Sequence, residues 1–108
     1  MQTLIHIYCT KGSSLREGIA NDRRLENHLL QVVNKQQPGR APGWMKIRST
    51  EPERRGAINV EWDGSSAVLK CRIINRGLGK PHLIVGDFLE YVLGCHKKRV
   101  RTITIVPS

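Results

Sequence analysis

The densest group of residues that could do chemistry is a basic run near the end of the chain, Lys97-Lys98-Arg99, followed by Arg101. No acidic residue follows Glu90 to offset these cations. Lysine and arginine bind phosphates, and each neutralised phosphate releases counterions, which makes the affinity depend on salt. For the run alone, a solvated helix end is the preferred interpretation, because cations are favourable there anyway.

Three further cations, Arg72, Arg76 and Lys80, come from the middle of the chain. They would join the basic run if the last strand lay beside the strand that carries Arg72. If they converged, a phosphate-binding surface would become the better interpretation than a solvated face. The candidate nucleic-acid-binding residues are therefore Arg72, Arg76, Lys80, Lys97, Lys98, Arg99 and Arg101.

Aromatic residues bear on the mode of binding, and the chain has few: one Phe, two Trp and two Tyr. Proteins that bind single strands stack bases on exposed aromatic rings. Trp44, on a predicted strand beside Lys46 and Arg48, is the one candidate platform, and packing under a helix or at an interface is the preferred role for it. Without a recognition-helix, zinc or RNP-type signature, nucleic-acid binding would depend on the phosphate backbone.

Catalysis and metal binding find no support in the residue spacing. The four histidines, His6, His28, His82 and His96, stand at no known ligand spacing. The nine acidic residues form no carboxylate pair and no Ser/His/Asp arrangement. We therefore expect no catalytic residue, no metal and no cofactor.

Composition bounds the class of protein. The 108 residues suffice for one domain, residues 1–108, and the formal charge of +9 favours anionic partners. No apolar run reaches the 18 or so residues of a membrane span, and the first residues lack the features of a signal peptide. The three cysteines, Cys9, Cys71 and Cys95, show no C-x-x-C spacing. Reduced thiols and a cytoplasmic location, with no membrane partner, are the expectation.

The fold is expected to be organised around a hairpin from Ala57 to Asn75, two alternating strands turning at Asp63-Gly64. A two-residue loop would place Val60 opposite Ala67, and a four-residue loop would place it opposite Leu69. Both registers keep the apolar side chains of the two strands on one face, so both remain open.

The other predicted elements follow from hydrophobic periodicity. A helix is predicted from about Asn21, because Leu25, Leu29, Val32 and Val33 form one apolar stripe at helical spacing. It must end before Pro38. The remaining elements are strands over Thr3–Cys9, Trp44–Arg48 and Arg99–Val106 and a helix over Ile84–His96.

The resulting order, β-α-β-β-β-α-β, predicts an α+β two-layer sandwich. In it, a mixed five-stranded sheet carries both helices on one face. The other sheet face would be solvated or a contact surface, and it would carry Asn59, Glu61, Lys70, Arg72, Thr102 and Thr104.

The sequence does not determine the function. The leading hypothesis is non-catalytic binding of a polyanion, nucleic acid above all, through a basic surface. One alternative is a homo-oligomeric interaction module that uses an exposed sheet edge or the outer sheet face. The other is small-molecule binding in a pocket between helices and sheet.

Overall fold

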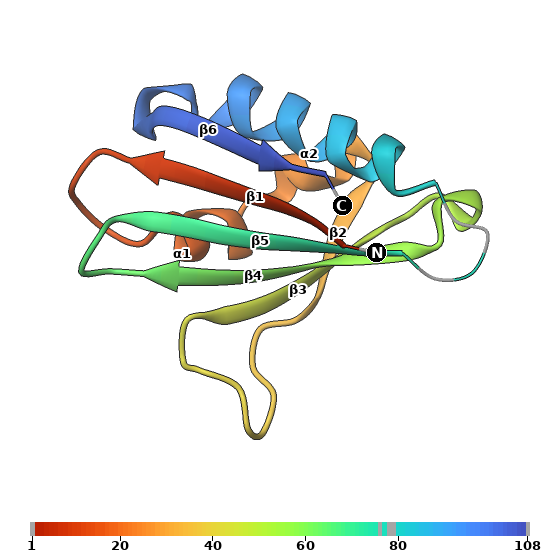
Figure 1. Cartoon of the computed structure of the whole chain (residues 1–108), viewed down its shortest axis with the longest axis horizontal. Coiled ribbons are helices and arrows are strands. Elements are labelled where there is room, and N and C mark those ends of the chain that lie inside the picture. Colours follow the sequence, from red (N-terminus) through yellow and green to blue (C-terminus); the bar gives the residue numbers. More distant parts are fainter. Residues whose placement is uncertain (1, 76, 78–79, 108) are drawn as a thin grey trace.

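The computed structural model describes residues 2–75, 77 and 80–107. Within them the strands form one six-stranded antiparallel sheet in the spatial order β2-β3-β4-β5-β1-β6 (Figure 1). The strands are β1 (Gln2–Cys9), β2 (Leu30–Asn34), β3 (Trp44–Ser49), β4 (Gly56–Asp63), β5 (Val68–Asn75) and β6 (Val100–Val106). The helices are α1 (Leu15–Ala20) and α2 (Pro81–Cys95), with 3-10 turns η1 (Arg23–His28), η2 (Pro52–Arg54) and η3 (Lys97–Arg99).

One apolar core joins the sheet to its helices. Ile5 and Ile7 of β1 and Phe88 of α2 are fully buried, and alternate residues of the neighbouring strands face the same core. Leu15 and Ile19 bring α1 into that cluster. The helices therefore cover one face of the sheet, and the α+β class is as predicted. In the described part of the chain, no helix has the length and apolarity that crossing a membrane requires.

The prediction of a mixed five-stranded sheet is wrong. A sixth strand, β2, forms from residues for which the sequence predicts a helix. Leu29 adopts a left-handed backbone (φ 63°) and ends η1, so the chain leaves the helical course there. Leu30 and Val32, two residues apart, then face the core as strand residues do. The β-branched Val32 and Val33 suit that conformation better than a helix.

The predicted hairpin forms, but in neither expected register. Val60 lies opposite Cys71, and Asp63 lies opposite Val68, so the loop covers residues 64–67. The loop has four residues, as in one of the two predictions, but it starts one residue later, at Gly64 instead of Asp63. The shift is an even number of residues in the pairing, so the apolar sets stay on the core side.

The last strand does not lie beside this hairpin. β6 pairs with β1, and β1 pairs with β5, so β1 separates the two. β2 and β6 are the two edges of the sheet.

Candidate functional site

The face of the sheet opposite the helices carries a set of basic side chains. The strand register places Lys46, Asn59 and Arg72 in one row across β3, β4 and β5, with Arg48 one row further along β3. Neighbouring strands lie about 4.8 Å apart, so β3 and β5 hold their cations within about 10 Å of each other. We call this surface the open face.

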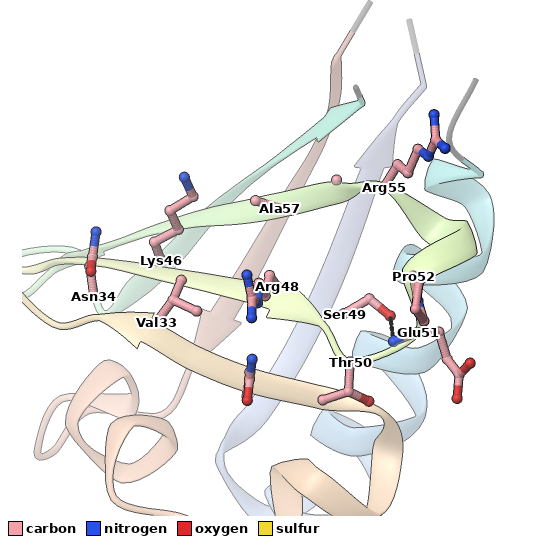
Figure 2. A pocket seen from close by; sticks show the side chains of 12 residues that line it. Val33, Asn34, Lys46, Arg48, Ser49, Thr50, Glu51, Pro52, Arg55 and Ala57 are labelled. Carbon is pink, nitrogen blue, oxygen red and sulfur yellow. Dashed lines mark hydrogen bonds between the residues drawn. The ribbon is translucent and has the colours of Figure 1, made fainter. Parts of the chain in front are cut away.

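A groove of about 720 Å³ runs along the open face over β2, β3 and the start of β4 (Figure 2). Three cations, Lys46, Arg48 and Arg55, line it, and Glu51 is the acidic side chain among the described lining residues. Its other polar lining residues include Ser49 and Thr50 and the amides of β2. A groove with this lining suits a phosphate-bearing ligand better than an apolar one.

Arg48 is held in place by its cross-strand neighbour. With its oxygen turned toward β3, the Gln31 amide accepts from Arg48 Nε at 2.9 Å and Nη2 at 3.1 Å. The guanidinium has five N–H donors in total, so most remain available to a ligand. Ser49 Oγ accepts from the backbone N–H of Glu51 at 3.0 Å and fixes the turn that closes this end of the groove (Figure 2).

A second, smaller hollow of about 140 Å³ lies further across the open face, between His6, Lys70, Arg72 and Arg40. Arg40 comes from the long β2–β3 loop, which projects from the sheet in Figure 1. Its guanidinium carbon lies 5.3 Å from the centre of the Trp44 ring. Trp44 is only 1% exposed, so it packs rather than offering a platform for a base.

Cations outnumber acids on the open face. Lys70 lies 3.7 Å from Asp63, whose pKa is lowered to about 2 by hydrogen bonds from the Ser65 and Ser66 hydroxyls and backbone. None of the other cations of the open face has a carboxylate within 4.0 Å in the described part of the chain. The cations are Arg40, Lys46, Arg48, Arg55, Lys70 and Arg72, and the carboxylates are Glu51, Glu61 and Asp63.

The structure does not gather the cations that the sequence singled out. Lys80 stands just before α2, and Lys97 and Lys98 stand just after it. A 15-residue helix is about 22 Å long, so these groups lie far apart. Arg72 lies on the open face, and Arg101 lies on β6 with β1 between the two strands.

Arg99 has a structural contact. It donates from Nε to Thr10 Oγ1 at 3.1 Å and from Nη2 to the carbonyls of Thr10 and Ser13. These bonds fasten the loop between β1 and α1. Arg76, the seventh residue of the predicted set, lies outside the described residues, so Arg72 is the described member that shares a face with the groove.

Comparisons with protein-family models, curated proteins and solved structures find no match. The chemistry of the open face is therefore what bears on the function. The described residues contain no group of three His, Cys, Asp or Glu side chains placed to hold a metal ion.

The most concentrated group of titratable side chains is buried instead. Tyr91 donates to Asp22 Oδ2 at 2.8 Å, and His96 Nε2 lies 2.7 Å from the Tyr91 oxygen and 3.1 Å from Asp22 Oδ2. Tyr91 is fully buried, and the other two side chains are nearly so. The network joins the start of η1 to the end of α2, which is a structural role.

Proposed function

We propose that the protein binds single-stranded nucleic acid, without catalysis, on the open face of its sheet. One observation carries the proposal. Arg40, Lys46, Arg48, Arg55 and Arg72 share this face, and none has a carboxylate within 4.0 Å among the described residues. Cations without carboxylate partners are available to neutralise phosphates, which supplies most of the affinity in sequence-independent binding.

The shape of the surface favours a single strand over a duplex. A duplex is read by a helix or a two-stranded ribbon in its major groove, but the helices of this protein lie on the other side of the sheet. On β1, Tyr8 is 38% exposed, and His6 lies beside it with ring centroids 6.3 Å apart. His6 also lines the smaller hollow with Lys70 and Arg72, and rings beside basic side chains are typical of surfaces that stack unpaired bases.

The proposal includes a cytoplasmic location. Cys9, Cys71 and Cys95 are free thiols, and free thiols persist in the reducing compartment where cellular RNA is found. Binding through the phosphate backbone implies little sequence preference.

Two matched triple variants test the proposal. The first, Lys46→Gln/Arg48→Gln/Arg72→Gln, removes three charges from the open face. The second, Lys80→Gln/Lys97→Gln/Lys98→Gln, removes three charges from the ends of α2. Both lower the formal charge by three from +9, so the general attraction to a polyanion falls equally in the two.

Fluorescence anisotropy with a labelled oligo(dT) or oligo(U) at about 50 mM salt is the measurement. We expect the open-face variant to bind about tenfold more weakly or worse, since each lost phosphate contact keeps its counterions bound. The helix-end variant should stay close to the natural protein. If the natural protein does not bind, or if both variants weaken equally, the open face is not the binding site.

A further inference from the structure

The two edges of the sheet differ in how well they are protected. β2 has five residues, and its pairing with β3 shifts between Val32 and Asn34. Short, irregular edges resist pairing with another chain. β6 is a seven-residue strand whose one charged residue, Arg101, lies near its start. Pro107 follows its end, so the stretch 102–106 has neither a charge nor a proline.

β6 also exposes apolar side chains. Ile105 is 45% exposed and Val106 is 55% exposed. Ile105 lies opposite Ile5 of β1 and so belongs to the helix side of the sheet, but α2 does not cover it fully. An edge strand with free backbone groups and apolar side chains invites a further strand.

A ridge of α2 also exposes apolar side chains. Tyr91 bonds to Asp22 at the start of η1, which places that side of α2 toward β2. Val85, Leu89 and Leu93, spaced four residues apart, form a ridge on the opposite side of α2. Leu93 is 46% exposed, so the ridge is incompletely covered.

From these observations we propose that two copies of the chain pair through β6, antiparallel and about a two-fold axis, so that two sheets become one. A two-fold axis at Thr104 places Ile103 of one copy opposite Ile105 of the other. It also places Thr102 opposite Val106. The two residues of every pair then lie on the same side of the joined sheet, either the helix side or the open face, as antiparallel partners must.

The charged residue of β6 does not prevent a second copy from pairing at this edge. With the axis at Thr104, the two Arg101 residues stand six positions apart along the ribbon, which is about 20 Å. That exceeds the Debye length of about 8 Å at physiological salt, so their repulsion is screened. A strand that meets itself about a two-fold axis also needs no other partner to be complementary. The pairing is independent of the proposed nucleic-acid binding.

Sedimentation velocity from about 1 to 50 μM tests the pairing. We expect the natural chain to sediment as a dimer, twice its 12.2 kDa, at the higher concentrations. Thr104→Lys sets two ammonium groups opposite each other at the axis and should weaken the dimer at least about tenfold. Val33→Lys adds the same charge to the other edge strand and should leave the dimer intact. A natural chain that stays monomeric at 50 μM, or equal weakening in both variants, overturns the proposal.

A cross-link supplies a readout that does not depend on loss of association. Thr104→Cys on each copy would place two Cα atoms about 4.5–5.5 Å apart, inside the range that a disulfide spans. Oxidation should give a covalent dimer on a non-reducing gel, and Thr50→Cys in the groove should give none. A dimer that the Thr104→Cys variant fails to trap would use another surface and would overturn this one.

Discussion

At the scale of single residues, His96 shows how burial sets the charge of a side chain. Burial lowers the pKa of His96, and Arg24 and Arg99 lower it further, while the nearby Asp22 carboxylate works against them. Asp22 keeps a pKa far below its usual range, chiefly through its hydrogen bond from Arg24. Tyr91 has its pKa raised by burial and by Asp22. A neutral His96 with its proton on Nε2 gives each member of the network a partner.

We expect this lowered pKa to appear as pH-dependent stability. The unfolded chain binds a proton at His96 near pH 6.5, before the folded chain does. The contribution of His96 to the free energy of unfolding is therefore fully present above about pH 6.5 and is lost as the pH falls through the folded pKa. Urea unfolding between pH 5 and 8 measures it. His96→Gln should flatten the slope below pH 6.5, whereas His82→Gln, at an exposed position on α2, should keep it. Equal slopes in both variants would contradict the assignment to His96.

At the scale of elements, alternation in the sequence predicts the strands well. Apolar residues every second position place both strands of the β4–β5 hairpin, and the period of α2 places the long helix within three residues of its observed start. The predicted hairpin register is wrong because Asp63 stays in β4 and caps the turn. Its carboxylate accepts hydrogen bonds from the backbone N–H groups of Ser65 and Ser66. That bond is local side-chain chemistry, which periodicity does not contain.

Residues 21–34 show why one predicted helix is wrong. The sequence predicts a helix that starts at Asn21, but the backbone N–H of Asn21 donates to the Glu17 carbonyl and closes α1. Asp22 then caps a separate 3-10 turn by accepting from the N–H of Arg24. In this stretch a helical stripe and a strand alternation overlap at Val32. Pairing with β3 decides between them, and pairing is a tertiary interaction.

Arg16 fastens the elements of this region, and its replacement should loosen them. It is 6% exposed and donates to the carbonyls of Lys35 and Trp44, the latter at 2.9 Å, at the ends of the β2–β3 loop. Arg16→Met keeps much of the length but removes the donors. We expect a loss of about 1.5–3 kcal/mol of unfolding free energy, typical of hydrogen bonds to a charged group.

Urea unfolding and amide exchange measure the effect of Arg16→Met. Exchange should rise in residues 35–44 more than in β5, because the bonds hold the base of that loop. Arg23→Met, on the exposed side of η1, is the control and should change stability by no more than about 0.5 kcal/mol. A uniform rise across the sheet would show that Arg16 stabilises the core generally rather than this loop.

At the scale of the whole molecule, the types of the site residues are visible in the sequence, but their assembly is not. Lys46 and Arg48 alternate with Met45 and Ile47, so their common face could be predicted. Joining them to Arg72 requires the strand order, which local patterns do not specify. The predicted set instead required β6 to lie beside the hairpin, and β1 occupies that place.

The salt dependence of binding separates a local site from the attraction of a basic molecule. Single-stranded binding follows a slope of about −0.7 in log K against log salt for each phosphate neutralised, so the five open-face cations without carboxylate partners predict about −3.5. The Lys46→Gln/Arg48→Gln/Arg72→Gln variant should fall to about −1.4, and the helix-end variant should keep the full slope. Anisotropy titrations of oligo(dT) between 50 and 300 mM salt measure both. Similar slopes in the two variants would mean that the net charge attracts the strand wherever it lies, because each variant lowers that charge by the same amount.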